Sequence, residues 1–414
     1  MSRSLLSLTL AFLVISSSAR AADEKLAPVS ERARKVHEAG MLFDGHNDLP
    51  WRLREDGDVK FETLDLSKRL PTGQTDIPRM REGGLKAQFW SVYIPSEHPN
   101  PARTVTEQID IVHRMIDRYP NDLELALNAD DVTRIVKSGK VASLIGIEGG
   151  IAIENDLAQL RAFHKLGARY MTLTHNSTLD WADAATDTPK HGGLSPFGER
   201  VVREMNRLGM LVDISHVSEG TMDDVLRVSE APVIASHSSA FALAPHPRNV
   251  PDAILKRLRK NGGVVMVNFF SGFVVPEYAR QMNAARKELK AKYTDPKAFA
   301  AAYQDWFKSN KLPRGTIPMV ADHIDHIVKV AGIDHVGIGS DFDGITAWPV
   351  GLDDVASYPR LTEELLKRNY SEADVHKILG GNVLRAFREA GNVSERLLKT
   401  TKPEVDQLST AKGH

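Results

Sequence analysis

The sequence contains no cysteine among its 414 residues. The chain can therefore form no disulfide bond, and its stability must come from the size of its apolar core. The absence of a cysteine behind the apolar N-terminal stretch also argues against a lipoprotein anchor. Hydrophobic residues make up 42% and charged residues 26% of the chain, which is the balance of an ordinary globular protein.

An excess of charge of one sign is also missing, since the formal net charge is −1. Proteins that bind nucleic acid or anionic lipid through their overall field carry a clear basic surplus. The sequence therefore predicts no nucleic-acid partner.

Long hydrophobic runs are absent apart from residues 5–15 near the N-terminus. This run is short for a bilayer span, follows Arg3, and precedes the small-residue pattern Ala19-Arg20-Ala21. We expect residues 1–21 to be a cleaved signal peptide and the protein to be periplasmic or secreted, with an uncleaved anchor helix as the alternative. The polar tail 400–414 has no hydrophobic lipid-anchor signal, so no stable membrane anchor is expected.

Short apolar runs recur eight times along the chain, and amphipathic stretches lie between most of them. This alternation indicates an α/β fold with buried parallel strands. Eight such units favour a closed (β/α)8 barrel of the TIM type over an open sheet. The predicted strands are 41–45, 87–94, 141–147, 170–174, 210–215, 233–236, 264–268 and 336–340, and the predicted helices include 105–119, 157–166, 196–208, 254–260 and 372–388.

Residues 22–414 are predicted to form one domain with a helical insertion at about 271–317, between the seventh and eighth strands. Two charged helical stretches, 280–293 and 295–309, make up most of this segment. Long insertions in compact domains are commonly functional. The segment is interpreted either as a lid over the mouth of the barrel or as a plain surface excursion.

Polar, chemically active residues follow six of the eight predicted strands. In a (β/α)8 barrel the carboxyl ends of the strands meet at one rim, which is where catalytic groups converge. The residues at these ends are His46, Asp48, Glu148, His175, His216, His237 and Asp341.

This set of side chains has the composition of a zinc site, because imidazole and carboxylate together suit that ion. His46 and Asp48 are two residues apart on a strand, so both leave the same face and can hold one ion. His216 and His237 come from adjacent strands and can hold a second. Glu148 lies between the two pairs in strand order, and a carboxylate can bridge two ions about 3.5 Å apart. A water held between such ions ionises near neutral pH and becomes a nucleophile for hydrolysis.

Each of these residues also has an ordinary structural interpretation. A single strand-end histidine is more often a hydrogen-bonded structural residue than a ligand. The segment 44–48 is equally consistent with a turn that has no role in metal binding, since Asp, Gly and Asn all favour turns. Six strand ends that all carry ligand or acid–base side chains are harder to attribute to chance.

Several motifs together resemble the membrane dipeptidase (renal dipeptidase) family of metallopeptidases, in that family's order and over nearly the whole chain after the leader. They suggest an exported member of bacterial type. The motifs are Phe43-Asp44-Gly45-His46-Asn47-Asp48-Leu49-Pro50, Ile147-Glu148-Gly149-Gly150, Leu173-Thr174-His175-Asn176, Asp213-Ile214-Ser215-His216-Val217-Ser218, Ala235-Ser236-His237-Ser238, His246-Pro247-Arg248-Asn249 and Gly339-Ser340-Asp341-Phe342-Asp343-Gly344.

The resemblance implies a (β/α)8 enzyme with two Zn²⁺ per chain that hydrolyses free dipeptides with a metal-bridging hydroxide. It assigns His46 and Asp48 to the first zinc, His216 and His237 to the second, and Glu148 to the bridge. It also implies a homodimer. Whether a D-residue is accepted at the C-terminal position is left open.

For catalysis and substrate binding, the resemblance implies that His175 contacts the scissile carbonyl or the oxyanion. Arg248 would bind the free carboxylate of the dipeptide, which its planar fork matches. Asp341 would carry the proton from the water to the leaving amine. Asp343, two residues further on, is a less favoured substitute for Asp341.

Other functions remain open at this stage. A different metal-dependent amidohydrolase, such as an N-acyl amino acid deacylase or a β-lactam hydrolase, could use the same ligands. Enzymes of that kind often have a carbamylated lysine as the bridge, whereas here the third strand ends in Glu148 and Lys140 lies at its start. A non-catalytic periplasmic binding protein is the less favoured alternative from another class.

Overall fold

The structure is a computed structural model that describes residues 27–56, 59–96 and 98–405. The predicted signal peptide, residues 1–21, lies outside the described residues. Within the described part of the chain, no helix combines the length and the apolar character needed to cross a bilayer.

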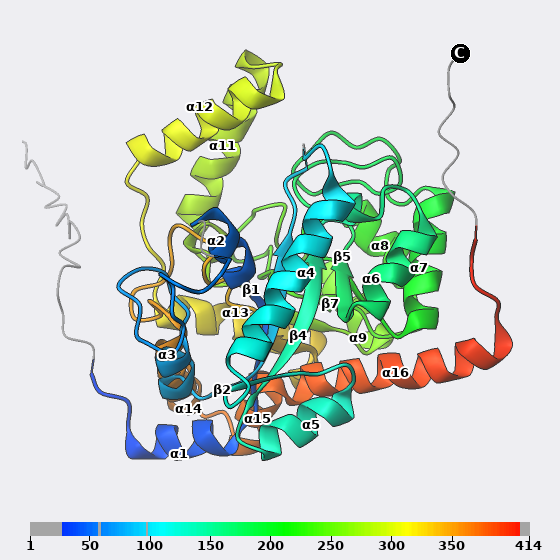
Figure 1. Ribbon diagram of the computed structural model, residues 1–414. Helices are drawn as coiled ribbons and strands as arrows, with labels where there is room; N and C mark the ends of the chain where they lie inside the picture. The colour runs from blue at the N-terminus through cyan, green and yellow to red at the C-terminus, as the bar shows by residue number, and fades with distance from the viewer. Residues whose placement is uncertain (1–26, 57–58, 97, 406–414) are drawn as a thin grey trace, which may run out of the picture.

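Eight parallel strands form a closed barrel surrounded by helices (Figure 1), which confirms the predicted fold class. Neighbouring strands pair in the order β2-β1-β9-β8-β7-β6-β5-β4, and β2 pairs with β4 to close the ring. The barrel strands are β1 (Leu42–Asn47), β2 (Leu85–Tyr93), β4 (Val141–Glu148), β5 (Ala168–Thr172), β6 (Leu211–Asp213), β7 (Ile234–Ala235), β8 (Val264–Val267) and β9 (Val336–Ile338).

All eight predicted strands are present, but one further strand was not predicted. The three-residue strand β3 (Leu123–Leu125) pairs with the first residues of β4, beside the barrel. So short a segment has no periodicity of its own, and its pairing depends on the tertiary fold.

Alternate side chains of each strand fill the barrel interior, and those between them face the surrounding helices. Because both faces of a strand are buried, every barrel strand is a continuous apolar run. Phe43 and Phe89 stack with ring centroids 5.3 Å apart, and Phe89 also contacts Tyr170. At the N-terminal end of the barrel, Phe387 of helix α16 (Asn382–Thr400) packs edge-on against Phe89. The opposite end, where the carboxyl ends of the strands meet, is left for the site.

Helices surround the barrel, and their ends follow local sequence signals. Helix α7 (Pro196–Leu208) begins after Ser195, whose side chain accepts the Gly198 N–H, and ends at Gly209 with φ of 74°. The other helices include α1 (Glu31–Ala39), α2 (Leu49–Glu55), α3 (Ile77–Glu82), α4 (Pro101–Arg118), α5 (Ala129–Lys137), α6 (Leu157–Lys165), α8 (Glu219–Val228), α9 (Asp252–Asn261), α10 (Ser271–Val274), α13 (Ile317–Ala331), α14 (Pro359–Lys367) and α15 (Glu372–His376).

The segment between β8 and β9 contains the two predicted long helices, α11 (Pro276–Lys292) and α12 (Pro296–Ser309). They project beyond the carboxyl end of the barrel, at the top of Figure 1. We call residues 276–312, which comprise these helices and the segment after them, the arm.

Candidate active site

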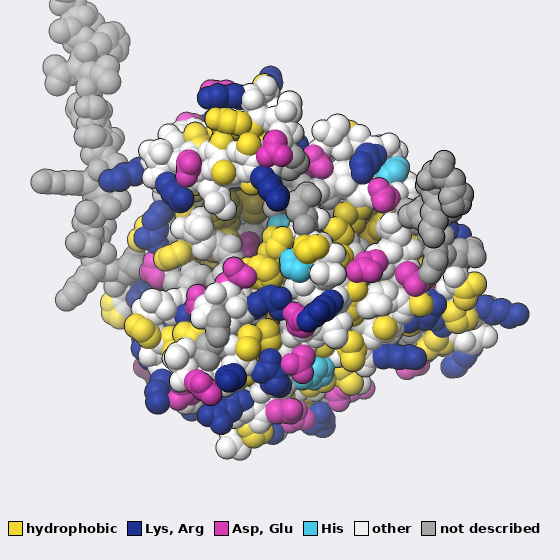
Figure 2. Space-filling model, turned by 45° about the horizontal axis from the view of Figure 1, so that its top comes forward, with side chains coloured by type: hydrophobic (Ala, Val, Ile, Leu, Met, Phe, Trp, Pro, Cys, Tyr) yellow, Lys and Arg dark blue, Asp and Glu magenta, His cyan; other side chains and the backbone are white. Residues whose placement is uncertain are grey.

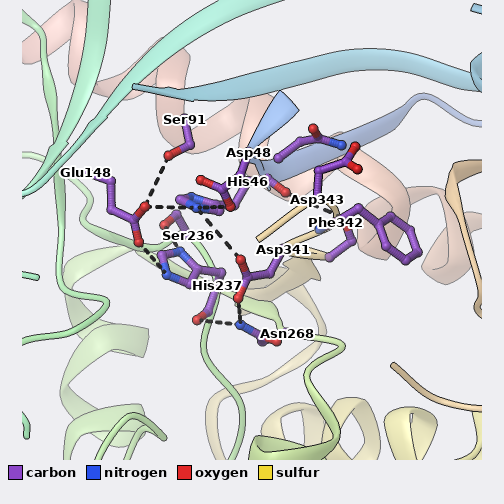
Figure 3. Close-up of polar contacts among 12 residues, drawn as sticks. His46, Asp48, Ser91, Glu148, Ser236, His237, Asn268, Asp341, Phe342 and Asp343 are labelled. Atoms are coloured by element: carbon purple, nitrogen blue, oxygen red, sulfur yellow. Dashed lines mark hydrogen bonds and ion pairs between the residues drawn. The ribbon is translucent and has the colours of Figure 1, made fainter. Parts of the chain in front are cut away.

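The residues predicted to carry the chemistry come together at the carboxyl end of the barrel. His46 and Glu148 lie at the ends of β1 and β4, and the others follow their strands directly. Donor atoms of all seven of these residues fall into three overlapping sets, and within each set they lie within 4.8 Å of one another: His46–Glu148–His237, Glu148–His175–His216 and His46–Asp48–Asp341. Figure 3 shows most of them pointing toward a common centre.

One half of the cluster surrounds His46, whose Nε2 atom is buried and forms no hydrogen bond with any residue that the structure describes. That nitrogen lies 3.3 Å from Asp48 Oδ2, 3.5 Å from Glu148 Oε2 and 4.0 Å from Asp341 Oδ1. Three carboxylates therefore converge on one imidazole, and this excess of negative charge suits a bound cation.

The other half of the cluster surrounds the second carboxylate oxygen of Glu148. Glu148 Oε1 lies 3.0 Å from His216 Nε2 and 3.4 Å from His237 Nε2, and these two nitrogens are 3.0 Å apart. His175 Nε2 is more distant, at 3.9 Å from the same oxygen. The two oxygens of Glu148 thus face two different sets of donors.

The backbone is strained at two of these positions. His216 and Asp341 have φ of 67° and 65°, in the left-handed region that non-glycine residues rarely adopt. Such a conformation costs on the order of 1–3 kcal/mol and is found preferentially at functional sites. Here the two turns aim the side chains into the cluster directly after β6 and β9.

Burial and neighbouring charges set the protonation of the cluster. Burial lowers the pKa of His216 and of His237 well below the ordinary value, with Glu148 only partly opposing it. Burial works against ionisation of Glu148, but His46, His216 and His237 together hold the pKa of Glu148 well below its usual range. For His46, burial is outweighed by Tyr170, Asp48 and Glu148, which together raise the pKa of His46 well above its ordinary value. Glu148 is thus ionised between neutral His216 and His237 on one side and a protonated His46 on the other, and a metal ion would replace the proton on His46.

Asp341 and Asp343 point in different directions. Asp341 Oδ2 accepts a 2.8 Å hydrogen bond from Asn268 Nδ2, and its other oxygen faces the cluster. Asp343 Oδ1 instead accepts the backbone N–H of Gln74 and lies 3.5 Å from Arg52 Nη1. Asp343 is therefore held by the segment around residue 74 and is a poor substitute for Asp341.

Arg248 is the buried cation of the site. Its Nη1 donates to Ser238 Oγ and its Nη2 to the His237 carbonyl, while Nε has no partner among the described residues. Burial lowers the pKa of Arg248 to about 10, which still leaves it charged at neutral pH. A buried guanidinium that retains free hydrogen-bond donors can bind a carboxylate.

A cavity of about 890 Å³ opens above these residues. Its floor includes Asp48, Glu148, His175, His216 and Asp341, and Arg248 lies in its wall. Figure 2 shows a hollow on this face, with acidic and histidine side chains around it.

Residues 30–401 match the family described as membrane dipeptidase, peptidase family M19. The chain belongs to the membrane dipeptidase family. The resemblance inferred from the motifs is thereby confirmed. As a member of this family of metallopeptidases, the chain is a dipeptidase, a hydrolase.

Relatives of this dipeptidase cover most of the chain. Dipeptidase 3 of Rattus norvegicus is 40% identical over 385 residues, which is 90% of this chain and 71% of the rat protein. A probable dipeptidase, PvdM, from Pseudomonas aeruginosa superimposes with a TM-score of 0.76 at 27% identity and covers 87% of this chain and 98% of its own. A metallopeptidase from Rhodobacter sphaeroides, liganded with a phosphinate mimic of L-Ala-D-Ala, gives 0.70 at 27% identity, with 84% and 99% covered.

The structure of this dipeptidase also shows residues that our sequence reasoning missed. Ser236 Oγ donates to Asp213 Oδ2 at 2.6 Å and lies 2.7 Å from His237 Nδ1, so it links the aspartate to the histidine. Asp44 accepts the N–H groups of His46 and Ser340 and so joins β1 to β9. The sequence signal for such residues is an aspartate two or three positions before a strand-end histidine, as in Asp44 before His46 and Asp213 before His216. This signal does not identify the hydrogen-bond partners of the aspartates, several of which lie on other strands.

Proposed function

We propose that this chain is a two-zinc dipeptidase whose metal ions are held on either side of Glu148. The observation that carries the proposal is the division of the Glu148 oxygens between His46 and Asp48 on one side and His216 and His237 on the other. Imidazole and carboxylate donors without thiolate suit zinc among the common divalent ions.

The donors fit such ions on grounds of chemistry. The Nε2 of His46 is buried without a hydrogen bond from the described part of the chain, and His216 Nε2 lies close to His237 Nε2. Both arrangements are costly without a positive charge between the donors. A pair of zinc ions, when bound, would lower the pKa of a shared water and polarise the substrate carbonyl.

The side chains around the donors would bind and orient the dipeptide. Arg248 would receive the free carboxylate and thereby restrict the length of the substrate, because a longer peptide places no charge there. His175, beside Glu148 on the cavity floor, would hydrogen-bond to the carbonyl oxygen as it becomes negative. Asp341, oriented by Asn268, would accept the proton of the attacking water and deliver it to the leaving amine.

Acceptance of a D-residue at the C-terminal position is part of this proposal. It is supported by the phosphinate mimic of L-Ala-D-Ala bound to the Rhodobacter sphaeroides metallopeptidase. The carboxylate and the scissile bond would keep their partners whichever way the C-terminal side chain points.

Other amidohydrolase chemistry, on N-acyl amino acids or β-lactams, is the alternative. The carbamylated-lysine variant finds no support in the structure, because Lys140 lies at the opposite end of β4 from the cluster, with Nζ 3.1 Å from Glu124. A non-catalytic binding protein is disfavoured by the intact set of donors. We further propose export to the periplasm or medium, on the pattern of residues 1–21, and a homodimer, on the family resemblance.

The test is hydrolysis of L-Ala-L-Ala and L-Ala-D-Ala by the purified full chain, before and after chelation, with metal content measured in parallel. We expect two zinc ions per chain, loss of activity on chelation, and recovery with added Zn²⁺. N-acetyl-alanine and a β-lactam, assayed alongside, should be hydrolysed more slowly. Activity that survives complete metal removal would contradict the proposal, and preference for the acyl substrate would favour the alternative.

A further inference from the structure

The cavity is larger than two small residues require. Its volume of about 890 Å³ lies near the upper end of the roughly 300–1,000 Å³ range of pockets that hold drug-sized ligands. Much of the additional wall comes from the arm, which contributes aromatic and aliphatic side chains together with four polar or charged ones. The arm residues at the cavity are Tyr278, Met282, Arg286, Tyr303, Gln304, Phe307, Lys308, Asn310 and Leu312.

An unbroken row of aromatic rings connects the buried arginine to the arm. The Arg248 guanidinium lies 5.1 Å from the centre of the Phe273 ring. Phe273 meets Phe270 edge-on at 5.0 Å, and Phe270 contacts Tyr278 of α11 at 5.6 Å. Phe307 of α12 packs on the same cluster, which is separate from the main core of the protein.

Polar contacts hold the arm over the rim. Asn283 Nδ2 donates to the Pro245 carbonyl at 2.7 Å, three residues before Arg248. On the other side of α11, Arg286 Nε donates to the Thr186 carbonyl at 3.1 Å, and Lys290 Nζ lies 3.2 Å from Asp187 Oδ1. These contacts tie α11 to the loops that follow β5 and β7. The arm is therefore a fixed wall of the cavity and more than a surface excursion.

We propose that the arm provides an apolar subsite for the side chain of the C-terminal residue of the dipeptide, and that the enzyme prefers a large aromatic or aliphatic residue there. The inference rests on the proposed role of Arg248 in binding the carboxylate. The carbon that bears the carboxylate also bears the C-terminal side chain, so that side chain lies next to Phe273. From there the ring row leads to Tyr278 and Phe307, where an apolar group loses contact with water.

The N-terminal residue would face a different wall. Tyr93 contacts His175 at 4.7 Å between ring centroids and meets Trp51 edge-on at 4.9 Å. Trp51 lies in α2, after β1, and Tyr93 is the last residue of β2; both are across the barrel rim from β7, which precedes Arg248. A change in the arm should therefore alter selectivity at the second residue of the dipeptide and leave the first unaffected.

The experiment compares kcat/KM of the zinc-loaded full chain for Ala-Ala, Ala-Phe and Phe-Ala, in the wild type and in three variants. We expect the wild type to favour Ala-Phe over Ala-Ala by about tenfold or more, the scale of a filled apolar pocket. Phe307→Ala should remove most of that preference without altering the ratio of Phe-Ala to Ala-Ala, and Phe307→Leu should restore part of it. Tyr293→Ala, an aromatic change on the arm outside the cavity, should behave as the wild type.

The outcomes separate the two proposals. If Ala-Ala and Ala-Phe are hydrolysed equally well, or if Phe307→Ala lowers all three substrates alike while its melting temperature is unchanged, the subsite is wrong and the dipeptidase remains. If the zinc-loaded protein hydrolyses no dipeptide, the proposed function fails and the subsite fails with it. If Phe307→Ala does not fold, the wild-type preference and Phe307→Leu decide the result.

Discussion

The phenol oxygen of Tyr170 lies 2.8 Å from Nδ1 of His46. Tyr170 is fully buried inside the barrel, and its ring occupies space that only a glycine leaves free, since a Cβ on Gly146 would lie 2.1 Å from Tyr170 Cζ. If Nδ1 donates to this oxygen, Nε2 keeps a free lone pair directed at Asp48 and Glu148. The contact at Nδ1 thus fixes the orientation of the imidazole, so that Nε2 faces the cluster.

Tyr170→Phe should therefore weaken metal binding at the His46 side of the site. Loss of an outer partner of a metal-binding histidine typically costs about 10–100-fold in affinity. Competition with a chromophoric chelator should show one of two tight sites weakened. Tyr370→Phe, which removes a phenol that donates to Asp325 on the outer helices, is the matched control. Unchanged metal affinity at both sites would show that Tyr170 fills space in the barrel and does not orient His46.

Gly344→Ala should displace Asp48. A Cβ at residue 344 would lie 2.1 Å from Asp48 Oδ2 and 2.8 Å from Asp341 Oδ1, so one or both carboxylates must move. We expect one metal ion per chain in place of two, and loss of most activity, with the fold retained. The control is Gly391→Ala in α16, where a Cβ would meet no atom of the described residues within 4 Å apart from the adjacent backbone of its own helix. Full metal content in Gly344→Ala would contradict the placement of Asp48.

Asp341→Asn should lower kcat by about 10²- to 10⁴-fold, the usual contribution of a positioned acid–base group. Metal content should stay at the wild-type value, because the amide can still pair with its neighbours. Asp343→Asn, two residues away and directed at Gln74 and Arg52, should retain most of the wild-type kcat. The reverse order of the two variants would make Asp343 the proton carrier.

Arg248→Met should raise KM for free dipeptides by about 10–100-fold, the value of a charged hydrogen bond or two. Dipeptide amides, which lack the carboxylate, should be hydrolysed poorly and to the same extent by both proteins. Arg280→Met, on the exposed side of α11, controls for loss of an arginine. Equal losses on acid and amide substrates would indicate that Arg248 supports the fold instead.

The stability of the metal-free protein should fall as the pH drops from 6.5 to 4. Burial lowers the pKa of His37 from its ordinary value of 6.5 to about 4, although the hydrogen bond to the Gly83 carbonyl opposes this. Between these values the unfolded chain binds the proton and the folded chain does not, so acid favours unfolding. At about 1.4 kcal/mol per pH unit, His37 alone should lower the free energy of unfolding by about 3 kcal/mol once the pH is below 4.

Urea unfolding at several pH values, with chelator present throughout, measures this loss. Chelator is needed because the metal donors also titrate in acid. His37→Gln cannot take up a proton and should show a shallower fall in stability with decreasing pH than the wild type. Parallel curves for the two proteins would exclude His37 as a source of the acid sensitivity.

The sequence by itself determined the barrel and the types of residue at its rim. Apolar runs closed by His46, Glu148 or Asp341 are local features, because a buried parallel strand must be apolar and its last residue must leave the barrel. Helix ends such as Ser195 and Gly209 are equally local. The metal-binding candidates, His175 and Asp341 could be named in this way, whereas Arg248, in the loop after β7, was assigned only through the family resemblance.

Only the tertiary structure decided how these residues meet. Asp341 and Asp343 have nearly the same left-handed φ, 65° and 64°, but Asn268 holds Asp341 at the cluster, whereas Gln74 and Arg52 hold Asp343 away from it. The fit of Tyr170 to Gly146, and the row of rings from Arg248 to the arm, join segments far apart in the chain. Sequence periodicity reports the environment of one element at a time, so contacts between elements appear only once all of them are packed together.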